Sequence, residues 1–338
     1  MDMTRLLRPL GLVTLASLVL ALIALIGERP VNAVAPPQLL LADYAAQIDK
    51  AQKLEVTHGR GLSGARALHV SRTETGWTVD ERWNYPANDE LVNETLLALA
   101  DLKALEARTA QADWHRALGL VVPEDLGAAV RFRVSDGEGQ ILASLLLGKE
   151  QQSESEATQE VKNYGPELRQ FYVRREDSAQ SWLARGRLPR NPDMAAWIDP
   201  TLPRHESDKL TKVRFGSGAG AFSMLRIGSG WSLGGAQNWL DRFAALRPDD
   251  VARAEAINFD TARPFTLQFE DGLSLTYENV GAATVIWSRI SARANADASD
   301  DIKALAGRLN NRFNGWALRF SAERTPLLLP AKIGRAHV

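Results

Sequence analysis

Apolar residues follow three patterns along this chain, and each pattern predicts a different structure. One unbroken apolar run, Leu10–Ile26, lies near the start. Beyond it, apolar and polar residues alternate over short stretches such as Val130–Val134, which is typical of strands with one buried face. Elsewhere apolar residues recur every three or four positions, as in Leu91–Leu102, which is typical of amphipathic helices. The chain therefore predicts an apolar leader followed by a body of strands and helices.

The run Leu10–Ile26 is long enough to cross a bilayer. Pro9–Gly27 holds 19 residues without a charge, and at about 1.5 Å per residue it would reach about 28 Å. Arg5 and Arg8 before the run favour a cytoplasmic N-terminus. The alternative is a cleaved signal peptide, since Val31–Ala33 is acceptable as a cleavage site. Both readings export the rest of the chain, which in a bacterium means the periplasm.

The first part of the body predicts a strand meander, a helix, a hairpin, a strand and a helix. Asn88 or Asp89 is expected to cap the first helix, because both side chains can accept backbone hydrogen bonds. The predicted elements are strands around Leu54, Leu68 and Trp77, a helix over Ala87–Leu105, a short apolar segment over Trp114–Leu120, a hairpin of Val130–Val134 and Ile141–Leu147, a strand over Phe171–Arg174 and a helix over Ser178–Ala184.

The same order of elements recurs after residue 200. Gly230–Trp231 matches Gly76–Trp77 in form and place, and we interpret the repeated order as an internal duplication. The predicted elements are strands around Val213, Phe222 and Trp231, a helix over Trp239–Leu246, a hairpin of Phe265–Phe269 and Leu273–Tyr277, a strand over Val285–Trp287, a helix over Ile302–Leu309, matched with the predicted helix of Trp182, and a last strand over Trp316–Phe320.

These elements predict an α+β fold, in which an N-terminal transmembrane helix precedes two duplicated units of antiparallel strands with packed helices. The expected divisions are 1–35 for the membrane anchor and a proline-rich spacer, 36–200 for the first unit and 201–331 for the second. Residues 150–166 are expected to form a solvated acidic loop. Ile333–Val338 has the sequence that a common sequencing adapter gives on translation, so 332–338 is expected to be an artefact.

Composition narrows the function. The net charge is −1, which gives no electrostatic reason to expect nucleic acid as a partner. The chain has no cysteine, so disulfides, thiolate metal sites and cysteine nucleophiles are excluded. The nine tryptophans are expected to pack in the core and at interfaces.

A search for catalytic and ligand motifs gives mostly absences. His58, His69, His115 and His205 are not spaced as metal ligands, and we expect surface or turn positions for them. The motif HExxH, the motif SxxK and the phosphate-binding loop are absent. The glycine-rich stretch Gly216–Gly220 lies between two predicted strands and is interpreted as a turn. The sequence therefore predicts no catalytic, cofactor-binding or metal-binding residue.

Acidic pairs receive structural interpretations as well. Asp249–Asp250 follows Pro248 and is expected to cap a turn. Asp300–Asp301 is expected at the N-cap and first turn of a helix, where negative charge is favoured. Paired carboxylates that meet only in the fold stay an open alternative.

A set of short motifs, taken in order, resembles a bacterial family of unassigned function found beside ABC transporters of the gliding-motility type. The resemblance spans about residues 1–325 and rests on the apolar run, Gly76–Trp77, Leu99–Leu102, Leu147–Lys149, Phe171–Arg174, Gly230–Trp231 and Val251–Ala252. It implies a membrane-anchored periplasmic auxiliary component, and the family has no catalytic residues to carry over.

Two functions follow as expectations. The first is a non-enzymatic accessory component of an ABC-type transport system, held in the inner membrane by its N-terminal helix, whose periplasmic body binds a permease, another partner protein or the transported substrate. The alternative is a cleaved periplasmic hydrolase that acts on an envelope polymer through paired carboxylates and whose mature chain starts near Val34.

Overall fold

The computed structural model describes residues 38–151, 168–189, 193–282 and 284–329. The predicted membrane helix, the spacer, nearly all of the acidic loop and the C-terminal tail lie outside these residues. No helix in the described part is long and apolar enough to cross a membrane. By its internal contacts the chain divides into Met1–Gln38 and Leu39–Val338, and nearly all of the described residues belong to the second unit.

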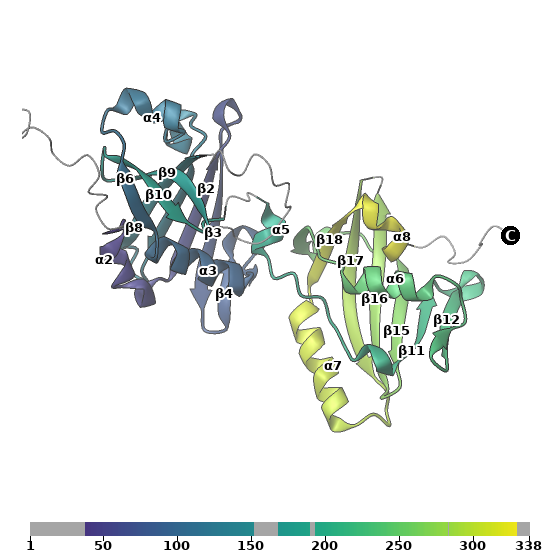
Figure 1. The fold of residues 1–338 in the computed structure, drawn as a ribbon. Helices are drawn as coiled ribbons and strands as arrows, with labels where there is room; N and C mark the ends of the chain where they lie inside the picture. Colours follow the sequence, from purple (N-terminus) through teal and green to yellow (C-terminus); the bar gives the residue numbers. More distant parts are fainter. Residues whose placement is uncertain (1–37, 152–167, 190–192, 283, 330–338) are drawn as a thin grey trace, which may run out of the picture. The chain divides into compact units, whose positions relative to one another are not determined.

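The fold is α+β, with two antiparallel sheets and few helices (Figure 1). This confirms the predicted fold class at that level. The first sheet has ten strands in the order β1-β6-β10-β9-β8-β7-β2-β3-β4-β5. Its strands are β1 (Gln38–Leu39), β2 (Lys53–Gly59), β3 (Ala65–Thr73), β4 (Gly76–Val79), β5 (Tyr85–Pro86), β6 (Lys103–Ala107), β7 (Val130–Ser135), β8 (Ile141–Glu150), β9 (Arg169–Arg175) and β10 (Ser181–Gly186).

The second sheet has eight strands in the order β13-β12-β11-β15-β16-β17-β18-β14. Its strands are β11 (Leu210–Phe215), β12 (Phe222–Ile227), β13 (Gly230–Trp231), β14 (Asp250–Arg253), β15 (Arg263–Phe269), β16 (Leu273–Ala282), β17 (Val285–Ala294) and β18 (Trp316–Ser321). Read from β4 to β6, eight strands of the first sheet have this same spatial order. The correspondence also holds along the chain, so that β2 matches β11 and β8 matches β16.

Alternation explains most of the strands, because their predicted apolar faces are largely buried. Leu54 and Val56 of β2 are fully buried and pair with Val134 and Phe132 of β7, which are also fully buried. The predicted hairpin around Asp136–Gly139 forms as expected, and its Asp136 side chain accepts hydrogen bonds from the N–H groups of Glu138 and Gln140. Register here follows from burying one face of each strand.

The helices are short apart from α3 and α7. The predicted cap of α3 is confirmed, since the Asn88 side chain accepts a hydrogen bond from the Leu91 N–H. At α7 the N-cap is Ser299, and Asp300 and Asp301 lie in the first turn. The helices are α2 (Ala42–Ala45), α3 (Asp89–Ala100), α4 (Ala112–Leu118), α5 (Met194–Trp197), α6 (Ala236–Ala244), α7 (Asp300–Phe313) and α8 (Thr325–Leu328).

Two predicted helices differ from the structure. The helix predicted over Ala87–Leu105 ends at Ala100, and β6 begins at Lys103. The helix predicted over Ser178–Ala184 is wrong, because these residues turn and form β10, whose Trp182 lies opposite Val173 of β9. Pairing with β9 and β6 determines this segment, and sequence periodicity could not reveal those partners.

Other expectations of the duplication also need correction. Helix α7 lies between β17 and β18, whereas β9 and β10 of the first sheet are joined directly, so α7 has no counterpart at Trp182. Asp250 does not cap a turn but begins β14, with its carboxylate 3.6 Å from the Arg319 guanidinium of β18. Asp249 accepts a hydrogen bond from the Ser321 N–H.

The matching Gly-Trp pairs occupy equivalent strands, but their glycines are constrained differently. Gly76 has φ of 132°, and a Cβ there would lie 2.8 Å from the Asp89 carboxylate. That carboxylate accepts a hydrogen bond from the Trp77 N–H at 3.0 Å. A Cβ at Gly230 would meet no atom closer than 3.8 Å. Of the two positions, only Gly76 therefore requires a glycine.

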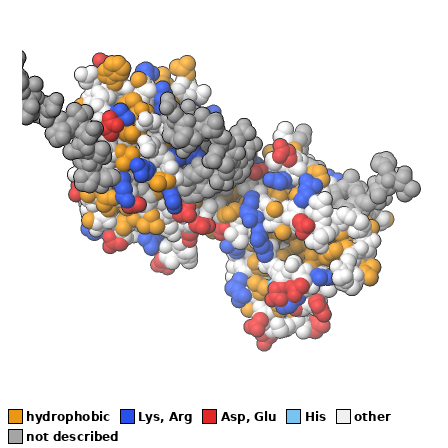
Figure 2. Space-filling view, in the orientation of Figure 1, with side chains coloured by type: hydrophobic (Ala, Val, Ile, Leu, Met, Phe, Trp, Pro, Cys, Tyr) orange, Lys and Arg blue, Asp and Glu red, His pale blue; other side chains and the backbone are white. Residues whose placement is uncertain are grey.

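Charges of both signs and hydrophobic side chains are interspersed over the face shown in Figure 2. The described part of this face has no broad field of one sign. This agrees with the net charge of −1 and gives no footprint for a polyanion.

Candidate ligand pocket

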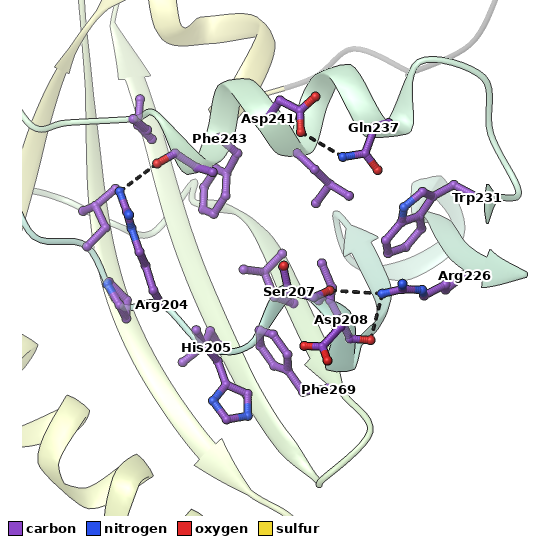
Figure 3. Close-up of a pocket in the computed structure, with 18 of the residues that line it drawn as sticks. Arg204, His205, Ser207, Asp208, Arg226, Trp231, Gln237, Asp241, Phe243 and Phe269 are labelled. Atoms are coloured by element: carbon purple, nitrogen blue, oxygen red, sulfur yellow. Dashed lines mark hydrogen bonds between the residues drawn. The ribbon is translucent and has the colours of Figure 1, made fainter. Parts of the chain in front are cut away.

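A cavity of about 550 Å³ lies between α6 and the second sheet (Figure 3). Its floor comes from β11, β12, β15 and β16, one end comes from β13, and the segment that leads into β11 closes another side. This volume is within the ~300–1,000 Å³ typical of small-molecule sites. The apolar side chains that line it are Leu202, Leu210, Trp231, Leu240, Phe243, Leu246, Leu267, Phe269 and Leu275.

Aromatic packing fixes the roof of the pocket. Trp239 and Phe243 stack on one face of α6 with ring centroids 5.1 Å apart, and both rings meet Phe265 of β15 edge-on. The buried Trp239 indole donates a hydrogen bond to the Leu327 carbonyl at 3.2 Å. Phe243 extends from α6 towards the sheet, and Trp231 faces the same space (Figure 3). The cavity walls are therefore held by contacts outside the cavity.

Two arginines lie at different ends of the pocket (Figure 3). One Nη of Arg204 donates to the Ala244 carbonyl of α6 at 2.8 Å. One Nη of Arg226 donates to the carbonyls of Ser207 and Asp208, at 3.1 and 2.8 Å. Among the described residues, neither guanidinium has a carboxylate within 4.0 Å. Both cations are therefore positioned by backbone oxygens.

His205 forms a hydrogen bond with Asp271 beside the pocket. Its Nε2 lies 2.5 Å from an oxygen of Asp271, and its ring meets Phe269 edge-on at 4.8 Å. Burial opposes ionisation of Asp271, but the hydrogen bonds from His205 and the Leu273 N–H outweigh it, so the pKa of this carboxyl lies below its usual value. The pair fastens the segment before β11 to the turn between β15 and β16.

The first sheet fills the place that corresponds to this pocket. The segment before β2 forms α2, which packs against α3 and β8, the counterparts of α6 and β16. Tyr44 of α2 is 1% exposed, and its hydroxyl donates to the Leu96 carbonyl of α3. In the second sheet the corresponding segment has no α-helix, and its residues line the cavity instead. Two sheets of one strand order thus differ in whether a helix covers this corner, although a cavity of about 550 Å³ also adjoins the outer side of α2.

The opposite face of the first sheet carries a charged cluster. Arg131, with a side chain 9% exposed, approaches Glu55 and Glu124 at 2.7 Å and Glu176 at 3.6 Å. Burial alone would raise the pKa values of Glu55 and Glu176, but hydrogen bonds and the nearby arginines hold both pKa values below the usual range. A general acid of a glycosidase needs the opposite shift, so this acidic pair does not suit that role.

The histidines are more buried than the sequence suggested. His58 of β2 and His115 of α4 are 8% and 7% exposed, so the expected surface or turn positions are wrong for these two. His205 lies in the connection before β11, but its side chain is only 9% exposed. His69 is exposed and lies 2.5 Å from Glu81. The described residues contain no group of three or more His, Asp or Glu side chains suited to a metal.

Sequence reasoning used Trp231 only as evidence for the duplication, and it missed Arg204, Arg226 and the His205–Asp271 pair as residues of a site. Arg226 lies in a strand with the usual alternation, and the segment around Arg204 has no periodic pattern. A comparison of the segments before β2 and β11 could have found the difference, since only the first carries an apolar helical segment with a tyrosine. Gly216–Gly220 forms the connection between β11 and β12, as predicted.

Comparisons with models of protein families, with curated proteins and with solved structures find no match for this chain. The resemblance to the transporter-associated family stays a prediction.

Proposed function

We propose that this protein is a non-catalytic, membrane-anchored accessory component of an ABC-type transport system, and that the pocket beneath α6 is its binding site. One observation carries the second part. The second sheet holds an apolar cavity of about 550 Å³ at the corner that the first sheet fills with α2 and Tyr44. A fold that can fill this corner but leaves it hollow in one copy is suited to binding there.

The internal duplication belongs to the same proposal. Eight strands share one order in the two sheets. Duplication of one ancestral unit explains this shared order, so the two sheets need not have arisen independently. After a duplication one copy can keep the packed corner for stability while the other opens it for a ligand. The two units of 36–200 and 201–331 then differ in role.

The location is inferred from the sequence. Leu10–Ile26 is long enough to span a bilayer, and Arg5 and Arg8 favour a cytoplasmic N-terminus. The body would then lie in the periplasm of a bacterium, next to a permease of the inner membrane. The cleaved periplasmic hydrolase stays the alternative, and it would need a processed N-terminus near Val34.

Affinity purification of the tagged full-length protein from gently solubilised native membranes tests this proposal. Mass spectrometry should find a permease and an ATPase with the protein, and the peptide that contains Leu10–Ile26 should be intact. A pocket-filling variant, Leu240→Trp, should change what is bound, while Leu97→Trp at an exposed site of α3 should not. A processed N-terminus near Val34 without any membrane partner would contradict the accessory role.

A further inference from the structure

The apolar part of the pocket lining suits a ligand with an extended apolar part. Trp231, Phe243 and Phe269 face the cavity together with leucines from the sheet and from α6. These side chains offer dispersion contacts to a hydrocarbon chain.

Arg226 supplies one charged contact at the end of the pocket next to Trp231 (Figure 3). One Nη already donates to the carbonyls of Ser207 and Asp208, and this holds the half-buried side chain in place. A guanidinium has five N–H donors, so its Nε and second Nη stay able to bind both oxygens of a carboxylate or phosphate.

The carboxylates near the pocket leave this cation unpaired. Asp241 accepts a hydrogen bond from Gln237 at 2.8 Å, and Asp271 is paired with His205. Asp208 contacts Arg226 through its backbone carbonyl, and among the described residues no carboxylate lies within 4.0 Å of Arg226. A positive group beside an apolar cavity complements a ligand that is anionic at one end.

We propose that the pocket binds a single-chain anionic amphiphile, with its hydrocarbon chain beneath α6 and its carboxylate or phosphate head group on Arg226. This rests on the proposed function of the pocket as a binding site. Arg204, at the other end of the cavity, is more exposed and lies away from the head group, so it provides a matched control.

Calorimetric titration of the full-length protein in a detergent-free polymer scaffold tests the assignment with four ten-carbon probes: decanoate, decyl phosphate, decanol and decyltrimethylammonium. One of the two anions should bind at least tenfold more tightly than decanol and the cation. Arg226→Gln should weaken anion binding about tenfold and leave decanol unchanged. Arg226→Lys should retain part of the affinity, and Arg204→Gln should change it less than twofold. Tighter binding of decanoate assigns fatty carboxylates, and tighter binding of decyl phosphate assigns phosphate head groups.

The Leu240→Trp variant distinguishes a failure of the pocket as a binding site from a failure of the anionic head-group assignment. If Leu240→Trp reduces the binding of every probe but decanol binds as tightly as the anions, the pocket is a binding site and the anionic head group is wrong. If Leu240→Trp changes the binding of no probe, while its unfolding transition matches the wild type, the pocket itself is not the site and both proposals fail.

Discussion

The hydroxyl of Tyr44 donates a hydrogen bond to the backbone carbonyl of Leu96, 52 residues further along the chain, at 3.2 Å. Burial raises the pKa of this hydroxyl above its ordinary value, so it stays a donor at every physiological pH. The contact joins α2 to α3 and fills the corner that is hollow in the second sheet. This contact has no counterpart among the described residues of the second sheet, where the segment before β11 lines the pocket.

Replacing Tyr44 therefore tests how much this filled corner contributes to stability. Tyr44→Ala should lower the free energy of unfolding by about 3–5 kcal/mol, because a large buried side chain is lost and a cavity remains. Tyr44→Phe keeps the packing and loses one hydrogen bond, so the loss should be about 1 kcal/mol. Urea unfolding followed by far-ultraviolet circular dichroism measures both changes.

The comparison of the two stability losses shows whether the Tyr44 ring or its hydroxyl contributes more. Equal losses for Tyr44→Ala and Tyr44→Phe would mean that the ring adds little and that α2 is not a structural plug. A suitable control is Trp114→Ala on α4, where the side chain is exposed and a change within about 0.5 kcal/mol is expected.

Alanine substitutions at two glycines should change the stability in opposite directions. A Cβ on Gly127 would lie 1.9 Å from the Val121 carbonyl oxygen, so Gly127→Ala must move backbone and should destabilise the protein by about 2 kcal/mol. Gly307 lies inside α7, where a Cβ would meet nothing within 4 Å. Gly307→Ala should stabilise by about 0.5–1 kcal/mol, because alanine favours the helix. Thermal unfolding of both variants measures the signs, and a stable Gly127→Ala variant would show that the Val121 loop is not tightly packed.

Much of the fold could be predicted because it rests on local pattern. The alternation in Val130–Val134 with the turn Asp136–Gly139 determines the hairpin of β7 and β8, and the three- and four-residue spacing determines most of α3. The repeated order of elements could also be predicted from the sequence, because apolar patterns show this order even where the residues differ. Each of these features depends on residues close in sequence.

The remaining features depend on partners that are distant in sequence. The segment of β10 is a strand because β9 and β6 flank it, and nothing within Ser178–Ala184 states this. The pocket exists because the segment around Arg204 lacks the helix that fills the same corner at Tyr44. An absence of this kind produces no motif, so sequence analysis had no positive signal for the binding site.

The hydrogen bond between His205 and Asp271 predicts that stability depends on the ionisation of Asp271. The pKa of Asp271 lies below its unfolded value of about 3.9, so the ionised form contributes stability at neutral pH that is lost as the pH falls through the lower, folded-state pKa. Asp271→Asn should cost about 1.5 kcal/mol at pH 7. The gap to the wild type should narrow as the pH falls below 4, as measured by urea unfolding at several pH values.

A control for this titration is Asp260→Asn, since Asp260 is exposed and lies in the connection between β14 and β15. It should change the free energy of unfolding by less than about 0.5 kcal/mol at either pH. A constant gap between wild type and Asp271→Asn from pH 7 to pH 3 would show that the lowered pKa of Asp271 is not what stabilises the segment before β11.

Replacing Arg131 in the charged cluster should also give a loss of stability that depends on pH. Here the variant removes the cation and not the carboxylate. Arg131→Met removes the nearest cation of Glu55, whereas Glu176 keeps its hydrogen bonds from Arg133 and Ser144, and removing one member of a buried ion pair costs about 3 kcal/mol at pH 7. In the variant the pKa of Glu55 should rise, because burial then opposes its ionisation with fewer favourable contacts, so the loss should shrink between pH 7 and pH 4. Arg66→Met, at an exposed position of β3, should show neither effect in the same unfolding measurements. A loss that stays at 3 kcal/mol at pH 4 would mean that Arg131 stabilises the sheet through packing of its aliphatic stem, because that contribution does not depend on the charge of its neighbours.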